Sequence, residues 1–164
     1  MAKLTTDGME EFIRTLNALG EKAGGVAKKC AYDGAKILRE EIAAGVRALP
    51  LDEDGFRKGS DPLKMITEAD RNDLENCLGV SRIESDGLVT SVSVSFDGYI
   101  RRTEDKYPKG VPAIMIARSI ESGSSVRAKK PFVRPAVNKA RERVLSAMQE
   151  TMSDSIQQIQ KLEG

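Results

Sequence analysis

Residues 88–96 read Leu-Val-Thr-Ser-Val-Ser-Val-Ser-Phe, and this stretch decides the fold class of the chain. Every second residue is apolar or threonine, whereas three of the four residues between them are serine. The alternation predicts a β-strand with one apolar and one serine-lined face. Asp86-Gly87 directly before it signals a type I′ turn, so the partner strand should cover residues 79–85 and the hairpin about 79–96. Because an isolated hairpin is marginally stable, we expect it to pack on helices and to gain another strand, for which residues 99–102 are the candidate.

Helical patterns precede the hairpin. Apolar residues recur at helical spacing from Met9 to Leu19, and Gly20 is predicted to end this first helix. A longer helix follows from about Gly25 to Arg47, and Pro50 ends it because the residue before a proline is pushed out of the helical region. Gly34 lies on the apolar stripe of this helix, which indicates a close crossing with another helix.

Three further helices are predicted. They cover about Pro62–Cys77, Pro112–Ser122 with Gly123 as its C-terminal stop, and Pro135 to about residue 162. The last helix would be about 40 Å long, and its distal half is polar apart from one apolar stripe. We expect that half to project and to pack on another chain. The predicted fold is α+β: two long helices and shorter helices pack on a small antiparallel β-sheet, in a single domain over residues 1–164.

Charge is balanced in total but not along the chain. The 26 Lys and Arg and 25 Asp and Glu give a net charge of +1. Residues 50–100 carry 5 basic and 11 acidic side chains, a net charge of −6, whereas residues 101–143 carry 12 and 4, a net charge of +8. Two loops, an acidic one over about residues 51–60 and a charged one over about 97–111, are predicted to be mobile. The opposite blocks favour solvated faces, complementary patches between copies, or contact with nucleic-acid phosphate.

The residue inventory argues against catalysis. Histidine is absent, which excludes Ser-His-Asp and Cys-His catalysis and His-ligated zinc within the chain. Cys30 and Cys77 cannot supply a four-thiolate zinc site, and we expect both to be reduced and buried. The carboxylates of Glu40-Glu41, Asp52-Glu53-Asp54 and Glu104-Asp105 are expected to be solvated. We therefore expect no catalytic residue, no metal and no cofactor, and a hydrolase with an unrecognised carboxylate pair is the third alternative for the function.

The sequence contains neither a signal-peptide pattern nor an apolar run long enough for a membrane span. The first twelve residues lack the apolar region of a signal peptide. The longest apolar run, Val111–Ala117, is far shorter than the ~20 residues of a membrane span. We expect a soluble protein of a reducing compartment with no membrane contact.

The segment from Ala117 to Ala136 carries a motif-like pattern, in which a glutamate and a glycine precede Pro-Phe-Val-Arg-Pro-Ala at residues 131–136. A long helix then begins. This pattern resembles the signature of the Hong Kong 97-like phage tail-component family, the tail-completion or head–tail joining proteins. Residues 48–55 resemble the family's proline–glycine element after its first helix. The residues that fill the pattern are Glu121, Gly123, Ser124, Ala128, Pro131, Phe132, Arg134, Pro135 and Ala136.

The resemblance implies a structural virion protein of a tailed phage or prophage. It implies a ring, hexameric by resemblance, at the head-proximal end of the tail or in the neck, made in the bacterial cytoplasm. The implied partners are further copies of the chain, neck or connector proteins and tail-tube or tail-terminator proteins, with non-specific DNA contact in the lumen as a further option. The resemblance also marks Glu121, Gly123, Pro131 and Pro135 as structural motif residues. From the residues themselves, Pro131 and Pro135 should stiffen the entry to the last helix, and Phe132 should anchor that helix to the sheet.

The expected docking mechanism is electrostatic. Acidic residues 52–86 of one copy would face basic residues 101–134 of the next. The residues expected at the subunit or partner interface are Arg101, Arg102, Lys106, Arg127, Lys129, Lys130, Phe132, Arg134, Asp52, Glu53 and Asp54. The alternative function is a nucleic-acid-binding accessory module that uses the basic segment 101–143.

Overall fold

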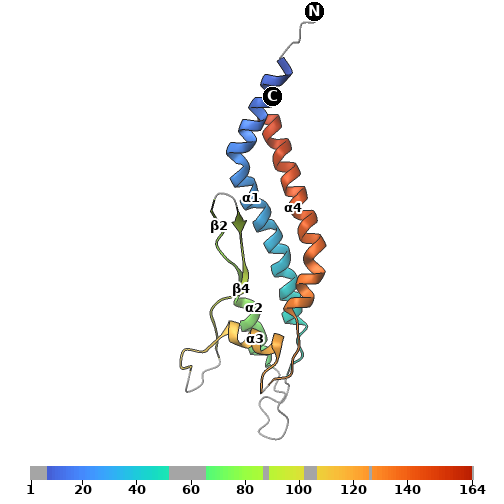
Figure 1. Cartoon of the computed structure of the whole chain (residues 1–164). Helices are drawn as coiled ribbons and strands as arrows, with labels where there is room; N and C mark the ends of the chain where they lie inside the picture. Colours follow the sequence, from blue (N-terminus) through green and yellow to red (C-terminus); the bar gives the residue numbers. More distant parts are fainter. Residues whose placement is uncertain (1–6, 52–65, 87–88, 102–106, 126, 164) are drawn as a thin grey trace, which may run out of the picture.

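The computed structural model describes residues 7–51, 66–86, 89–101, 107–125 and 127–163, with side chains from residue 20 to residue 161. The helices are α1 (Asp7–Arg47), α2 (Glu68–Asn76), α3 (Ala113–Ser122) and α4 (Val133–Glu163). The strands are β1 (Leu78–Val80), β2 (Glu84–Ser85), β3 (Thr90–Ser91), β4 (Val94–Phe96), β5 (Tyr99–Ile100) and β6 (Val111–Pro112). Figure 1 shows α1 and α4 as a long antiparallel pair, with the smaller elements gathered around its lower half. The predicted α+β fold is confirmed.

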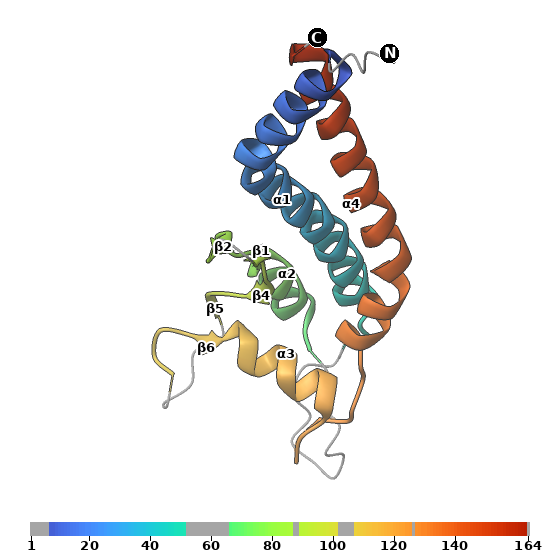
Figure 2. The ribbon, with the colours of Figure 1, turned by 45° about the horizontal axis from the view of Figure 1, so that its top comes forward.

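Helix α1 runs without interruption through Gly20, so the predicted end of the first helix at Gly20 is wrong. A glycine inside a helix costs only about 1 kcal/mol relative to alanine, which tertiary packing readily offsets. Figures 1 and 2 both place the C-terminal part of α4 beside the first half of α1. The helix ends at Arg47, before Pro50, as predicted.

The seam between α1 and α4 is tight. A Cβ added at Gly34 would lie 3.1 Å from side-chain atoms of Met148 and Val144, which confirms the close crossing predicted there. Further along, Thr151 Oγ1 donates a hydrogen bond to Asp33 Oδ2 at 3.2 Å, and Ile159 is buried. The distal half of α4 therefore packs on α1 of the same chain, and its packing on another chain stays a prediction. Because α1 does not break at Gly20, it is long enough to cover the apolar stripe of α4.

The predicted hairpin is present, in two short ladders. Strand β1 pairs with β4, and β2 pairs with β3, all antiparallel. The predicted turn at Asp86-Gly87 is wrong by one residue, because Ser85 pairs with Thr90 and Asp86 N–H donates a hydrogen bond to the carbonyl of Val89 at 3.2 Å. The two residues between Asp86 and Val89 lie outside the described residues. The Asp86 side chain favours this pairing, since its carboxylate accepts a hydrogen bond from Val89 N–H at 2.8 Å.

The expected third strand forms but joins another partner. Tyr99–Ile100 is β5, and it pairs with β6 rather than with the hairpin. The predicted loop 97–111 thus contains a second small ladder, and residues 102–106 lie outside the described residues. No other described strand pairs with the hairpin, so its outer edge has no strand partner among the described residues.

Helix α2 begins at Glu68, so its predicted start at Pro62 is wrong. Thr67 has extended backbone angles and forms a capping box with Asp70, which fixes the first turn. Ile66 instead forms a bridge with Leu51. The stop of α3 at Gly123 is confirmed, and Gly123 has a positive φ of 79°.

One core holds these elements together. Its largest fully buried side chains are Ile66, Leu74, Ile100 and Val46. Phe132 at the start of α4 meets the ring of Phe96 edge to face, with ring centroids 6.0 Å apart, so it anchors α4 to the hairpin as predicted. Cys30 is buried, as expected, whereas Cys77 is only half-buried.

Candidate assembly interface

The structure divides the predicted interface residues into three groups. Asp52, Glu53, Asp54, Arg102 and Lys106 lie outside the described residues. Lys129, Lys130 and Arg134 are exposed. Arg101, Arg127 and Phe132 are used within the fold. The structure therefore leaves three described cations of the predicted set on one surface, around the segment that joins α3 to α4.

Glu121, the last-turn glutamate of α3, caps the N-terminus of α4. Its carboxylate accepts hydrogen bonds from the N–H groups of Phe132 and Val133, at 2.7 and 2.9 Å, and from Arg134 N–H at 3.1 Å. Burial alone would raise the pKa of Glu121, but these three amide hydrogen bonds, with the positive charge of Arg134, outweigh it and hold the pKa below its ordinary value of 4.5. The first N–H groups of a helix have no partner inside it, so a carboxylate brought from another helix satisfies them.

The residues around Glu121 complete this joint. Lys130 N–H donates to the carbonyl of Ile120 at 2.8 Å, which ties the linking segment back to α3. A Cβ at Gly123 would lie 3.2 Å from Lys129, so the chain passes close to itself there. Pro131 precedes the helix and Pro135 lies in its first turn, where a missing N–H costs nothing. We name this unit, residues 120–136, the α3–α4 joint.

Phe132 belongs to the interior of the joint. Its side chain is buried, and α1 approaches it closely at Gly45, where an added Cβ would lie 3.2 Å from the carbonyl oxygen of Phe132. The expectation that it lies at a subunit interface is therefore wrong, because the apolar ring is taken up by the chain's own core.

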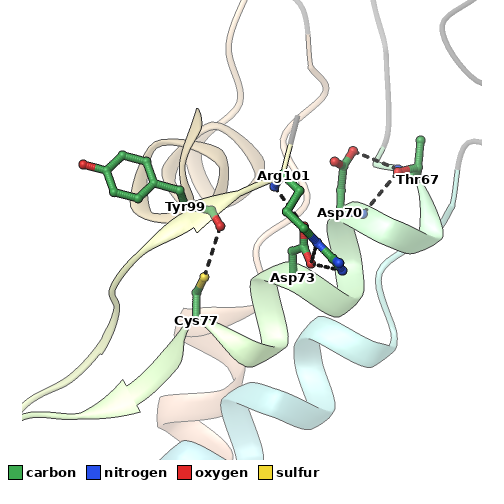
Figure 3. A network of polar contacts seen from close by, with 6 residues as sticks. All are labelled: Thr67, Asp70, Asp73, Cys77, Tyr99 and Arg101. Atoms are coloured by element: carbon green, nitrogen blue, oxygen red, sulfur yellow. Dashed lines mark hydrogen bonds and ion pairs between the residues drawn. The ribbon is translucent and has the colours of Figure 1, made fainter. Parts of the chain in front are cut away.

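Asp73 and Arg101 form a polar network between α2 and β5 (Figure 3). Arg101 donates from its guanidinium to Asp73 Oδ1 at 2.7 and 3.0 Å, and its backbone N–H donates to Asp73 Oδ2 at 2.9 Å. The hydrogen bonds from Arg101 lower the pKa of Asp73, and Asp73 in turn raises the pKa of Arg101. An acidic-block residue thus meets a basic-block residue within one chain, but the Arg101 side chain stays 82% exposed, so its contact with a neighbouring copy stays a prediction.

Cys77 closes the other side of that network. Its Sγ lies 3.8 Å from the carbonyl oxygen of Tyr99, as Figure 3 shows. Burial, with the negative charges of Asp73 and Asp97, raises the pKa of the Cys77 thiol. The chain packs closely on this thiol, since a Cβ added at Gly98 would lie 3.2 Å from Cys77 Sγ.

Glu41 of α1 holds two cations of α4. Its carboxylate accepts hydrogen bonds from Lys139 Nζ and, at 3.0 Å, from Arg143. The hydrogen bond from Lys139 lowers the pKa of Glu41. The expectation that Glu40-Glu41 is solvated is therefore wrong for Glu41. The sequence signal was its position seven residues after Gly34, on the face that meets α4.

Arg127 points inward. Its residue is only 8% exposed, and its guanidinium donates to Ser119 Oγ at 2.8 Å. The prediction that Arg127 contacts phosphate or a neighbouring subunit is therefore wrong. The exposed cations of this region are instead Lys109, Arg118, Lys129, Lys130 and Arg134.

A cleft of about 490 Å³ opens beside these cations, between the C-terminal end of α1 and the start of α4. Lys130 and Lys139 lie on its wall, and small residues of α1 form its floor. Along α4, the apolar side chains of Val137, Leu145 and Met152 stay exposed at spacings of eight and seven residues, which places them on one helix face. Exposed apolar side chains thus lie along α4, and charged side chains lie at the cleft near its start.

Among the residues that the structure describes, no group of three or more Cys, Asp or Glu side chains is arranged to hold a metal ion. No helix within the described ranges is long and apolar enough to cross a membrane. Comparisons with models of known protein families, with curated proteins and with solved structures found no significant match.

Proposed function

We propose that the chain is a structural, non-catalytic virion protein of a tailed phage or prophage that forms a ring, hexameric by resemblance, in the neck. Its role would be tail completion or head–tail joining. One observation carries the proposal. The residues that resemble the phage tail-component signature are the residues that build the α3–α4 joint, in which Glu121 caps α4 and Phe132 enters the core.

The joint suits a ring component because a ring repeats one subunit geometry at every interface. It fixes the direction in which the long α1–α4 pair leaves the smaller elements, as Figure 2 lets the reader follow. A subunit whose helices pointed in varying directions could not close a ring. The internal contacts of the joint therefore support assembly indirectly, whereas its exposed cations Lys129, Lys130 and Arg134 can contact a partner.

Of the predicted interface residues, Lys129, Lys130 and Arg134 are exposed and can take part in docking. Asp73 and Arg101 neutralise one another within the chain. Exposed carboxylates remain on α2 and on the hairpin side at Glu68, Glu84 and Asp97. These surfaces complement the exposed cations around the joint, and opposite potentials of this kind steer and register association.

Light scattering coupled to size exclusion tests the ring. The protein should form a defined oligomer at about 50 mM salt and lose subunits at about 1 M, where the screening length falls to about 3 Å. The double variant Lys129→Glu with Lys130→Glu should weaken the oligomer at low salt. Lys28→Glu, an exposed position on α1 away from the joint, is the matched control and should leave it intact. A monomer at every salt and protein concentration, also when mixed with tail-tube or connector proteins, would contradict the proposal.

A second candidate is a nucleic-acid-binding accessory module. Lys129 and Lys130 favour it, since they are adjacent, exposed and form no ion pair with a residue that the structure describes. Arg101 and Arg127 no longer support it, because both are used inside the chain. The same double variant separates the two: for this candidate it would abolish a DNA affinity that falls steeply with salt and leave the oligomer unchanged.

A further inference from the structure

A groove runs between the hairpin and α4, with α1 as its floor. Three cavities of about 340, 270 and 310 Å³ lie end to end along it. The first two share Ala31, Thr90 and Met148, and the second and third share Val94. The α1 floor extends from Ala23 to Ile42, a length of about 29 Å at the helical rise. We call this feature the hairpin groove.

The wall on the hairpin side is a strand edge. Residues 90–92 and 94–96 line the groove, and no described residue of the first hairpin strand does. Because neighbouring side chains of a strand point to opposite faces, a groove lined by consecutive residues follows the edge of the strand. In Figure 1 the hairpin and α4 both lie along α1, and Thr90 and Met148 line the same two cavities.

The backbone groups on this edge are free. Ser81 N–H bonds to the carbonyl of Ser93, and Asp97 N–H bonds to that of Cys77. These bonds place Val94 at a non-hydrogen-bonded position of the antiparallel ladder, so that its N–H and C=O point away from β1. The same alternation directs the backbone groups of Thr90 and Phe96 outward, and no described residue hydrogen-bonds to them.

The edge also lacks the usual protection against pairing. Residues 88–96 contain no charge, no proline and no glycine, whereas natural edge strands usually carry such residues. Apolar side chains flank the groove and remain exposed: Val89 at 62% and Met152 at 52%. An unprotected edge beside an apolar trough indicates a surface that another polypeptide covers.

The groove has a charged end. Arg118 and Arg134 line the third cavity, near α3. Arg118 forms no ion pair within the described part of the chain, and Arg134 reaches Glu121 only at 3.9 Å. Carboxylates of an occupant would complement these guanidiniums.

We propose that the hairpin groove binds an extended segment of another protein, which adds as a strand to the edge formed by residues 90–96. Alternate apolar side chains of the segment pack on α1 and α4, and its acidic end lies at Arg118 and Arg134. An extended segment fits better than a helix because the edge needs backbone partners, and a helix uses its own backbone groups internally. About nine residues span 29 Å in extended form. The groove shares Arg118 and Arg134 with the exposed cations near the joint. Peptide binding and ring formation are measured separately, so either proposal can fail alone.

The test uses fluorescein-labelled nonapeptides and the full-length protein. The probes are Asp-Glu-Val-Thr-Val-Thr-Val-Thr-Gly and its reversed sequence, since the strand can add in either direction. Fluorescence anisotropy should give a Kd of about 10–100 μM for one orientation. Peptides N-methylated at alternate residues, in two sets, decide the binding mode: the set that blocks the amides facing the edge should bind at least ~10-fold more weakly, because those hydrogen bonds are lost.

The protein variants locate the charged end. Arg118→Glu with Arg134→Glu should weaken binding at least ~10-fold, whereas Arg82→Glu, exposed on the other hairpin strand, should not change it. Amide exchange followed by NMR should slow at Thr90, Val94 and Phe96 when the peptide is bound. The proposal is overturned by no binding of either orientation up to about 1 mM. It is equally overturned if both N-methylated sets bind like the parent peptide, or if protection appears elsewhere and not along this edge.

Discussion

Replacing Glu121 with alanine tests the α3–α4 joint most directly. The substitution removes the one carboxylate that accepts from three consecutive amides at the start of α4, at 2.7–3.1 Å. It leaves those N–H groups in a part-buried place, with few alternatives other than water. The joint should loosen, and α4 should lose its fixed start.

The magnitude follows from the contacts. A hydrogen bond to a charged group contributes about 1.5–3 kcal/mol, and loss of a helix N-cap costs about 0.5–2 kcal/mol. The Glu121 side chain is 14% exposed, so little of this is screened by solvent. We expect the free energy of unfolding to fall by about 2–3 kcal/mol, which for a chain of this length lowers Tm by roughly 5–10 °C.

The contribution of Glu121 to stability depends on pH and decreases in acid. The folded pKa of Glu121 lies below 4.5, so its contribution to stability is complete above pH 4.5 and is lost as the pH falls through the folded pKa. The difference in unfolding free energy between the wild type and Glu121→Ala should therefore be constant at neutral pH and shrink in acid. Urea denaturation at several pH values measures it. Glu142→Ala, an exposed position on α4, is the control and should cost under about 0.5 kcal/mol. Equal effects of the two variants at pH 7 would refute the capping argument.

Two further perturbations concern the α2–β5 network and the helix seam. Asp73→Asn should lower the free energy of unfolding by about 1–2 kcal/mol in urea denaturation, a modest value because the Arg101 side chain is 82% exposed. The folded pKa of Asp73 lies below its ordinary value of 3.8, so its contribution to stability is complete above pH 3.8 and is lost as the pH falls through the folded pKa. The wild type should therefore approach the variant's stability in acid. Gly34→Ala should lower Tm, because the new Cβ meets Met148 at 3.1 Å, whereas Gly24→Ala, with nothing within 4 Å, should raise stability by about 0.5–1 kcal/mol. Equal shifts for the two glycines in calorimetry would contradict the seam.

Local patterns predicted those elements whose signal lies within a few residues. The alternation at residues 88–96 predicted the hairpin, and Gly123 predicted the end of α3. The predicted helix end at Gly20 was wrong because packing outweighs the local propensity there. The apolar stripe of α4, more than a hundred residues away in sequence, packs along α1 and stabilises the helix through Gly20. The third strand failed for a similar reason, since Tyr99–Ile100 found a partner in β6.

The buried charges escaped prediction because their partners are distant in sequence. Glu41 pairs with Lys139, 98 residues further on, and Asp73 with Arg101, 28 residues further on. Nothing in the pair Glu40-Glu41 indicates which carboxylate turns inward, except its register on the face that Gly34 marks. The net charge of a block of sequence does not show which charged side chains pair within the chain, because it counts paired and exposed cations together.

The division between the joint and the exposed surfaces has a consequence for the proposed function. Glu121, Pro131, Phe132 and Pro135 serve the geometry of the chain, and none of them offers a free group to a partner. A change at one of these internal residues should therefore weaken every assembly contact together, because it would misdirect α1 and α4. Changes at Lys129 and Lys130, or at the edge of residues 90–96, should instead remove one contact and leave the fold in place. Partner specificity on this scaffold then resides in surfaces that can vary without any change in the joint.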